Sequence, residues 1–236
     1  MKAVIMAGGK GTRLMPLTKD IPKPMVKIID KPVLEHTIEL LKKHKITEIA
    51  ITLGYMPERI IDYFGDGKKW NVDITYFIED TPLGTAGSVK RTHNFVSDDF
   101  LVMSGDAYTE INITKAIRFH HAKESIFTLV AQPHQNPIGL GTLEIDINNR
   151  VSAFIEKPKN VVPSLINTGI YIINKSVINL IPEGFYDFGK QLIPKLKDKV
   201  CAYVDYAYWS DIGTLTSYYR TNEKVAIELE SIQQRS

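Results

Sequence analysis

The sequence predicts an α/β protein with a mostly parallel, doubly wound sheet and a single domain. Short apolar runs alternate with helical patterns through the first half of the chain, and the second half is richer in strand-like runs. The 236 residues fit one domain of the usual size, roughly 50 to 250 residues. We find no linker and no internal repeat in the sequence. One domain is therefore expected.

The first half predicts a βαβ repeat. Four apolar runs indicate strands, at residues 2–7, 48–53, 73–78 and 100–103. Leu34, Ile38 and Leu41 recur at helical spacing, which predicts an amphipathic crossover helix over 33–44. A second helix should follow Pro57 and end near Gly65 and Gly67, because proline suits the start of a helix and glycine its end.

The second half predicts further strands and a final helix. Apolar or alternating runs bounded by proline and asparagine indicate strands at 125–131, 141–147, 151–155 and 166–173, with Pro133 as one of the separators. A helix is expected over 215–229, followed by a frayed polar tail at 233–236. His120 and His121 are adjacent, and we expect both to be surface residues of a helix.

Composition excludes several classes of function. The chain has 29 Lys and Arg against 27 Asp and Glu, so a net charge of +2 gives no broad field for nucleic acid or an anionic membrane. No apolar stretch approaches the roughly 20 residues that span a bilayer, and the N-terminus lacks the pattern of a signal peptide. The single Cys201 cannot form an internal disulfide. A cytoplasmic protein with a local cationic site is expected.

A glycine-rich, cationic loop follows the first predicted strand. Gly8, Gly9 and Gly11 allow backbone conformations and close approaches that side chains would block. Arg13 and, further on, Lys23 add the charge that a polyphosphate site needs. The pattern therefore indicates phosphate chemistry, and a surface turn with an incidental basic residue is the alternative.

Two well-known glycine loops do not fit this segment. A dinucleotide-binding fingerprint would need a third glycine where Leu14 stands. A P-loop would need Lys-Ser or Lys-Thr after the last glycine, where the chain has Thr12 and Arg13. Another kind of phosphate loop is therefore required.

The loop also belongs to a series of motifs. AGGKGTRLMPLT followed by PKPM resembles the signature of the sugar-phosphate nucleotidyltransferases, and within them the bacterial mannose-1-phosphate guanylyltransferases. Later segments resemble further motifs in the family's order: EDTPLGTAGS at 79–88, SGDA at 104–107, FIEKP at 154–158, NTGIYI at 167–172 and YWSDIGT at 208–214. The resemblance covers the chain to about residue 220.

The resemblance implies a Rossmann-like domain of the nucleotide-diphospho-sugar transferase fold. Residues 1 to about 110 would bind the nucleotide, about 111–220 the sugar phosphate, and 221–236 would form a C-terminal helix and tail. The implied reaction is attack by a sugar 1-phosphate on the α-phosphorus of a nucleoside triphosphate, with release of pyrophosphate. Such transfers depend on alignment and charge neutralisation more than on a protein nucleophile.

The resemblance also implies the site residues. Arg13 and Lys23 would be the catalytic cations on the phosphates, and Mg²⁺ would bind Asp106 and Asp211. The remaining nucleotide contacts would be Ala7, Gly8, Gly9, Gly11, Thr12, Glu79, Gly84 and Thr85, and the sugar contacts Gly141, Glu156, Lys157 and Asn167. The family usually has Tyr where Leu140 stands, which puts that wall of the sugar pocket in doubt.

The residues support part of this set. Asp106 follows an apolar strand, at the edge where open α/β sheets bind ligands, and two carboxylates suit a hard cation such as Mg²⁺. Each aspartate by itself would equally serve as a turn or cap residue. Glu156-Lys157 alone would equally be a solvated charge pair at a strand end.

Glu79 bears on the choice of base. In relatives the residue five places before the glycine of the second nucleotide loop reads the base edge, and here that spacing joins Glu79 to Gly84. An ionised carboxylate can accept from both donors of guanine, whereas uracil and thymine present one donor between acceptors. An exposed acid at a strand end is the alternative for Glu79.

The favoured substrates are GTP and mannose 1-phosphate. The alternatives within the class are glucose 1-phosphate with UTP or dTTP, and another sugar phosphate with GTP. A silent homologue that binds nucleotide sugars is the alternative from another class, although the retained charged set argues against it. No nucleic-acid or membrane partner is expected, and a homo-oligomer is compatible with the sequence.

Overall fold

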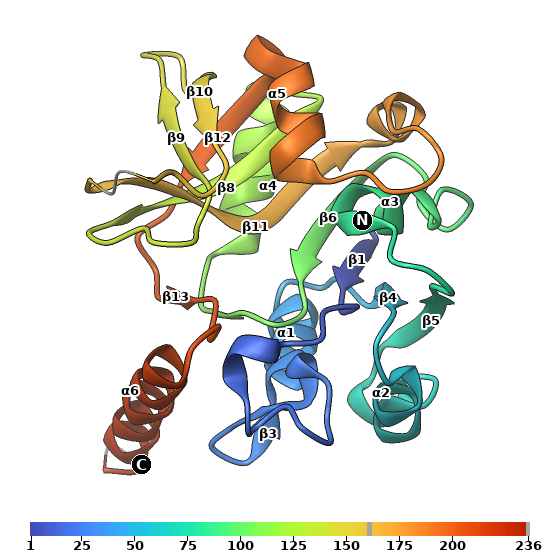
Figure 1. Cartoon of the computed structure of the whole chain (residues 1–236), viewed down its shortest axis with the longest axis vertical. Helices are drawn as coiled ribbons and strands as arrows, with labels where there is room; N and C mark the ends of the chain where they lie inside the picture. Colours follow the sequence, from blue (N-terminus) through green and yellow to red (C-terminus); the bar gives the residue numbers. More distant parts are fainter. Residues whose placement is uncertain (160–161, 235–236) are drawn as a thin grey trace.

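The computed structural model describes residues 1–159 and 162–234 (Figure 1). In this part of the chain, nine strands form one sheet in the order β10-β9-β11-β6-β1-β4-β5, with β8 between β11 and β12. The strands are β1 (Ala3–Met6), β4 (Glu48–Leu53), β5 (Asp73–Ile78), β6 (Asp99–Ser104), β8 (Phe127–His134), β9 (Thr142–Ile145), β10 (Val151–Ile155), β11 (Ser164–Asn174) and β12 (Val200–Val204). Two small ribbons pair β2 (Lys27–Ile28) with β3 (Lys31–Pro32) and β7 (Tyr108–Thr109) with β13 (Trp209–Ser210).

The sheet is mixed and mostly parallel, as the sequence predicts. β6, β1, β4 and β5 are parallel neighbours, and β12 is parallel to β8. β11 runs antiparallel to β6, β8 and β9. Because Ile170 of β11 lies opposite Met103 of β6, the residues that precede Ile170 reach the edge where β1 and β6 end. The second half of the chain thereby contributes to the ligand-binding edge of the first.

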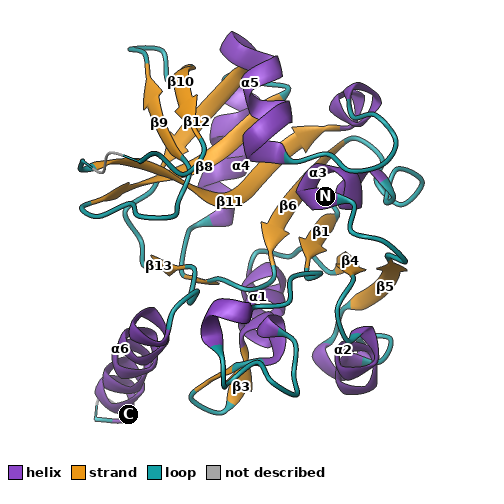
Figure 2. Cartoon of the chain, in the orientation of Figure 1, coloured by secondary structure: helices purple, strands orange, loops and turns teal. Residues whose placement is uncertain are grey.

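Helices cover both faces of the sheet (Figure 2). They are α1 (Val33–Lys43), α2 (Pro57–Phe64), α3 (Gly84–Lys90), α4 (Ile113–Ala122), α5 (Ile193–Leu196) and α6 (Leu215–Gln233). A π-helical turn spans Phe188–Leu192, and short 3₁₀ turns span Thr12–Leu14, Lys23–Met25, Lys68–Trp70, Lys175–Leu180 and Lys197–Lys199. Of the described helices, none is long and apolar enough to cross a membrane.

Two apolar cores result from the alternation of side chains along the strands. Val4 of β1 packs in the core that includes Ala86 of α3 and Leu192 of the π-helical turn. Its neighbour Ile5 points to the other face, where the core includes Leu34 of α1 and Ile60 of α2. The first strand is thus buried on both faces, and the loop that follows it emerges between the two layers.

Several element boundaries differ from the expectations. β8 continues through Pro133, which we expected to be a separator. β12 pairs with β8 only as far as Ala131, so at position 133 no described strand lies on that side to require the N–H that proline lacks. α6 extends to Gln233, beyond the expected end at 229, so Gln233 is helical and not part of a frayed tail; the rest of the expected tail at 235–236 lies outside the described residues. The sequence analysis missed α3 and the helical turns at 188–196.

The surface expectation for His120 is wrong. Its side chain is 1% exposed, whereas His121 beside it is exposed. Nδ1 lies 2.8 Å from Thr128 Oγ1, while Nε2 lies 3.6 Å from Asp99 Oδ2, too far for a hydrogen bond. Burial lowers the pKa of His120 and outweighs the nearby Asp99 carboxylate. One face of α4 packs on the sheet, and residue 120 lies on that face while residue 121 does not.

This buried histidine predicts a pH dependence of stability. Unfolded histidine has a pKa of about 6.5, so below that pH the unfolded chain binds a proton that folded His120 does not. The stability present above this pKa is therefore lost as the pH falls toward the lower pKa of the folded state. We expect the urea midpoint of the native chain to fall between pH 7.5 and pH 5 by more than that of His120→Gln. A urea midpoint of His120→Gln that falls as much as that of the native chain would contradict the assignment.

Candidate active site

The phosphate loop is held closely against its neighbours. Gly11 adopts φ of +65°, and a Cβ there would lie 2.7 Å from Lys23 Cβ. The Thr18 hydroxyl donates to the Gly11 carbonyl at 2.8 Å, and Ala7 N–H donates to Thr52 O at 2.9 Å. Only glycine fits position 11 without strain. The loop is therefore packed against the segment that carries Lys23.

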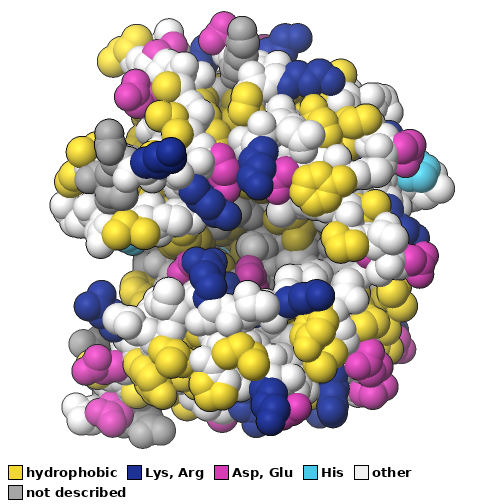
Figure 3. All heavy atoms as spheres, in the orientation of Figure 1, with side chains coloured by type: hydrophobic (Ala, Val, Ile, Leu, Met, Phe, Trp, Pro, Cys, Tyr) yellow, Lys and Arg dark blue, Asp and Glu magenta, His cyan; other side chains and the backbone are white. Residues whose placement is uncertain are grey.

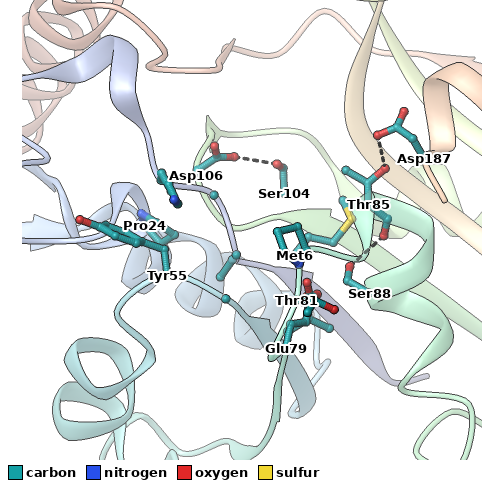
Figure 4. A pocket seen from close by; sticks show the side chains of 18 of the residues that line it. Met6, Pro24, Tyr55, Glu79, Thr81, Thr85, Ser88, Ser104, Asp106 and Asp187 are labelled. Carbon is teal, nitrogen blue, oxygen red and sulfur yellow. Dashed lines mark hydrogen bonds between the residues drawn. The ribbon is translucent and has the colours of Figure 1, made fainter. Parts of the chain in front are cut away.

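A cavity of about 540 Å³ lies at the carboxyl ends of β1, β4, β5 and β6 (Figure 4). The space-filling view shows this face hollowed between its upper and lower parts, with charged side chains on both rims (Figure 3). Six of the predicted nucleotide residues line the cavity together with Asp106: Ala7, Gly8, Gly9, Glu79, Gly84 and Thr85. The predicted site residues did not include other residues of the wall: Tyr55, Phe185 and Asp187, which no motif marks, and Asp80, which lies within the EDTPLGTAGS motif.

Lys23 joins the two predicted metal ligands. The lysine is 6% exposed, and its Nζ donates to Asp106 Oδ2 at 2.8 Å and to the backbone oxygen of Asp211 at 2.6 Å. The Ser104 hydroxyl donates to Asp106 Oδ1 at 2.7 Å (Figure 4). Two aspartates that are distant in sequence therefore meet around one buried cation beside the cavity.

The environment of Asp106 keeps its carboxylate ionised. Burial by itself raises the pKa of Asp106, but the ion pair with Lys23 and the hydrogen bonds from Lys23 and Ser104 more than offset this effect. The pKa of Asp106 therefore lies below its usual value. An anionic oxygen is available at this edge of the cavity throughout the neutral range.

The donor set at this point fits Mg²⁺. Within the described ranges, no group of three His, Cys, Asp or Glu side chains converges on a metal-sized site. Mg²⁺ usually needs only one or two protein carboxylates, because waters and substrate phosphates complete its shell. Lys23 contacts the backbone of Asp211, whose carboxylate accepts from Gly213 N–H at 3.1 Å through Oδ1. Asp106 and Asp211 are the candidate ligands for such an ion.

Arg13 extends from the phosphate loop to the second half of the chain. A Cβ built on Gly213 would lie 3.2 Å from Nη2 of Arg13 and 2.5 Å from Oδ2 of Asp211. Nη1 of Arg13 lies 3.8 Å from the Cβ position of Gly139. The guanidinium group thus lies beside Asp211, at the boundary between the two halves of the chain. In the part of the chain that the structure describes, Gly11, Thr12 and Arg13 do not line the cavity.

The predicted sugar residues form a second cluster. Oε2 of Glu156 lies 2.8 Å from the Cβ position of Gly141 and 2.5 Å from that of Gly189, so a side chain at either glycine would displace the carboxylate. Asn167 N–H donates to Gly141 O at 2.9 Å, and its side-chain amide donates to the Tyr171 hydroxyl at 2.8 Å. Burial raises the pKa of Glu156, and the charge of the neighbouring lysine opposes this shift.

Lys157 occupies an unusual backbone conformation next to this cluster. Its φ is +52°, and Nζ lies 3.7 Å from Glu156 Oε1. The side chain is more than half exposed, so the lysine is free to move toward a ligand. In the described part of the chain, Gly141, Glu156, Lys157 and Asn167 do not line the 540 Å³ cavity.

Two predicted nucleotide residues are already engaged with the protein. Oε2 of Glu79 accepts a hydrogen bond from Leu83 N–H at 3.2 Å. Burial raises the pKa of Glu79, and this hydrogen bond and Arg91 oppose the rise. The Thr85 hydroxyl donates to Asp187 Oδ2 at 2.9 Å (Figure 4). Glu79 keeps its second oxygen for a ligand, whereas the Thr85 hydroxyl is turned toward the wall.

The geometry agrees with the comparisons with known proteins. The sequence profile described as nucleotidyl transferase matches residues 2–228. The chain belongs to the nucleotidyl transferase family. This result confirms the resemblance found in the motifs: the relatives of the chain are sugar-1-phosphate nucleotidyltransferases, which are transferases of nucleotide-sugar biosynthesis.

Curated members of the family differ in substrate. The chain is 36% identical to a UTP–glucose-1-phosphate uridylyltransferase of Synechocystis, with 99% of the chain and 66% of that protein covered. It is 34% identical to mannose-1-phosphate guanyltransferase 2 of Candida glabrata, with 90% and 61% covered. It is 38% identical to the D-glycero-alpha-D-manno-heptose 1-phosphate guanylyltransferase of Campylobacter jejuni, with 93% and 97% covered. The chain thus spans less than two thirds of the first two relatives and nearly all of the third.

Solved structures of the family share the fold. The crystal structure of HddC from Yersinia pseudotuberculosis superposes with a TM-score of 0.85 at 33% identity, and covers 95% of this chain and 99% of that one. The same protein was also crystallised in complex with GMP-PN. The predicted fold class, a mixed and mostly parallel sheet flanked by helices, is therefore confirmed.

Proposed function

We propose that this nucleotidyl transferase family member joins a nucleoside triphosphate to a sugar 1-phosphate, giving a nucleotide sugar and pyrophosphate. The observation that carries the proposal is the contact of buried Lys23 with both Asp106 and Asp211 beside the cavity. Residues 1–110 would bind the nucleotide and 111–220 the sugar phosphate, so this contact joins the two substrate halves. We place the reaction in the cytoplasm, where nucleoside triphosphates are available.

The proposed chemistry needs no nucleophile from the protein. An oxygen of the sugar 1-phosphate forms a bond to the α-phosphorus of the triphosphate. The bond from that phosphorus to the bridging oxygen breaks, and its electron pair leaves with pyrophosphate. Alignment and charge neutralisation supply most of the acceleration in such transfers. Lys23 would neutralise the phosphates nearest the reacting phosphorus, and Arg13 the leaving pyrophosphate.

The remaining residues would bind and orient the substrates. The triphosphate would lie against the backbone of Ala7, Gly8 and Gly9, because these small residues leave room for its phosphates beside the loop. Lys157 would neutralise the sugar phosphate, while Glu156 and Asn167 would hydrogen-bond sugar hydroxyls. Mg²⁺, held by Asp106 and Asp211, would supply positive charge to the phosphate oxygens.

GTP and mannose 1-phosphate are the proposed pair. Glu79 lines the cavity, and its Oε2 already accepts from Leu83 N–H. Because each carboxylate oxygen has two lone pairs, both oxygens can still accept from the two guanine donors, which supports guanine as the base. The Candida glabrata relative, named for mannose 1-phosphate and guanyl transfer, supports the same pair. A heptose 1-phosphate with GTP is the second candidate, because the Campylobacter jejuni relative is of nearly the same length as this chain.

A panel of substrates tests the proposal. The protein is incubated with Mg²⁺, one of GTP, UTP, dTTP, ATP or CTP, and one of mannose, glucose or heptose 1-phosphate, and pyrophosphate release is followed. We expect the fastest release with GTP and mannose 1-phosphate. A faster rate with another pair would overturn the proposed specificity, and no release with any pair would overturn the activity.

Glu79→Gln tests whether the Glu79 carboxylate recognises guanine. The substitution keeps the shape of the side chain but gives one oxygen and one amide nitrogen, which no longer accept both guanine donors. We expect kcat/KM for GTP to fall about 5- to 150-fold, equivalent to the ~1–3 kcal/mol of a bidentate base contact. UTP and dTTP use should fall less. Glu110→Gln, at an acid outside the cavity lining, serves as the control, and equal losses on all three nucleotides would contradict the role of Glu79.

A further inference from the structure

A segment of the second half of the chain is hydrogen-bonded to the nucleotide half. Residues 184–189, here termed the bridging segment, lie against α3. The Tyr186 carbonyl accepts from both Ala86 N–H and Gly87 N–H at 2.9 Å, and Tyr186 N–H donates to Leu83 O at 2.8 Å. The first turn of α3 and the bridging segment thus satisfy each other's backbone groups.

Two glycines of α3 let its backbone pack directly against the backbone of the bridging segment. A Cβ on Gly84 would lie 2.7 Å from Tyr186 O, and one on Gly87 would lie 2.6 Å from Gly184 O. These distances are shorter than any real Cβ contact, so the two backbones are in direct van der Waals contact. A displacement of α3 therefore displaces the bridging segment with it.

Side chains close the junction on the cavity side. The Thr85 hydroxyl donates to Asp187 Oδ2 at 2.9 Å and accepts from Phe188 N–H at 2.9 Å. Both Thr85 and Asp187 line the cavity, and they point toward each other in Figure 4. The other oxygen of Asp187 accepts from Lys190 N–H at 3.0 Å, which holds the start of the helical turn at 188–192. A ligand in the cavity would touch this hydrogen-bonded pair.

The far end of the bridging segment reaches the predicted sugar cluster. The Cβ position of Gly189 is 2.5 Å from Oε2 and 3.1 Å from Cδ of Glu156, so this backbone is the wall against which the carboxylate rests. Asp187 is also close enough to Glu156 for its charge to raise the pKa of that carboxyl, in addition to the larger effect of burial. One short segment thus contacts α3 at one end and Glu156 at the other.

We propose that Thr85 and Asp187 are positioning residues that couple the two substrate sites through the bridging segment. The inference rests on the proposed function, and it adds the path by which one substrate affects the other. A nucleotide seated against Gly84 and Thr85 fixes α3 and the bridging segment, which holds the Glu156 carboxylate in place for the sugar phosphate. Because coupling free energies are reciprocal, the sugar phosphate must tighten nucleotide binding by the same factor.

Thr85→Val tests the coupling. The change keeps the shape of the side chain and removes the hydroxyl that joins Asp187 to Phe188 N–H. The measurement is the calorimetric Kd of the sugar 1-phosphate, alone and with a saturating non-hydrolysable analogue of the nucleoside triphosphate, using the pair that the panel selects. In the native protein we expect the analogue to tighten this Kd by about tenfold, within the usual range of couplings. In Thr85→Val we expect the Kd of the sugar 1-phosphate to be nearly the same with and without the analogue, a ratio near one. Thr85→Ser keeps the hydroxyl and should restore the native tenfold ratio.

Matched variants and steady-state kinetics distinguish the outcomes. Thr92→Val removes a buried hydroxyl that donates to Val89 O in its own turn, away from the bridging segment, and it should keep the native ratio. Thr85→Val should also raise the KM of the sugar phosphate more than it lowers kcat. If Thr85→Val does not fold, Thr85→Ala gives the same loss of the hydroxyl with less bulk. A Kd ratio near one in the native protein, or a native ratio in Thr85→Val or Thr85→Ala, would overturn the coupling. The proposed function is tested separately, by pyrophosphate release from the native protein, and would stand in either case if release is seen.

Discussion

Lys23→Met is expected to lower kcat by about 10²- to 10³-fold, the usual cost of removing one preorganised group that stabilises transition-state charge. Methionine fills a similar volume but carries no charge and no donors. The substitution leaves Asp106 without its partner at 2.8 Å and removes the link to the Asp211 backbone at 2.6 Å. Turnover is measured as pyrophosphate release at saturating substrates.

Stability and turnover should separate for this variant. Breaking a buried ion pair costs about 3–5 kcal/mol, because one charge is left unpaired. The double variant Lys23→Met, Asp106→Asn should recover part of that stability, since neither charge remains, but it should recover no turnover. Lys27→Met, at an exposed lysine in β2, is the control and should keep the native rate. A folded Lys23→Met protein with more than a tenth of the native kcat would contradict the assigned role.

Asp211→Asn is expected to lower kcat by at least about 100-fold, because it removes a carboxylate that we propose binds Mg²⁺ beside the reacting phosphates. Lys23 contacts only the backbone oxygen of Asp211, so this bond survives the substitution. Gly213 N–H can still donate to the amide oxygen. The variant therefore tests the carboxylate charge with little change in structure.

The dependence on Mg²⁺ distinguishes a metal ligand from a structural turn residue. Rates are measured over a Mg²⁺ titration, and thermal unfolding is measured without substrate. We expect Asp211→Asn to need more Mg²⁺ for half-maximal rate while its melting temperature stays close to that of the native chain. Asp62→Asn, at an exposed residue of α2, should change neither quantity. A lower melting temperature with an unchanged Mg²⁺ requirement would assign Asp211 to the turn.

Strand positions in the first half were largely predictable, and some helices were not. β4 and β5 match the expected ranges, and so does β10 in the second half, because their apolar residues follow strand periodicity. α3 includes Gly84 and Gly87, and glycine has a low helix propensity, so nothing local indicates a helix. This helix is stabilised by hydrogen bonds from its first turn to Tyr186, which lies about a hundred residues away.

The burial of individual polar residues could also not be predicted from the sequence. His120 and His121 have the same chemistry and adjacent positions, but only His120 faces the sheet, where Thr128 of β8 meets its ring. Proline at position 133 predicts the end of a strand, but Pro133 lies within β8 because β12, the strand beside it, has already ended. In each case the deciding partner is distant in the chain.

The candidate site divides in the same way. Arg13, Lys23, Asp106 and Asp211 were named from their motifs, because glycine loops and aspartates after strands have local signals. Asp187 and Phe185 belong to no such motif, and they enter the cavity wall only because the bridging segment packs on α3. Thr85 was predicted as a nucleotide contact, and the structure shows its hydroxyl bonded to Asp187.

The sequence by itself determined the family, the α/β class and the residue types that can neutralise phosphates, because these depend on local periodicity and on short motifs. Only the tertiary structure decided which of those residues meet. Lys23 contacts Asp106 and Asp211 because parallel strands end at one edge and because the chain returns to that edge after β12. Such contacts depend on strand order and register, which no short stretch of sequence specifies.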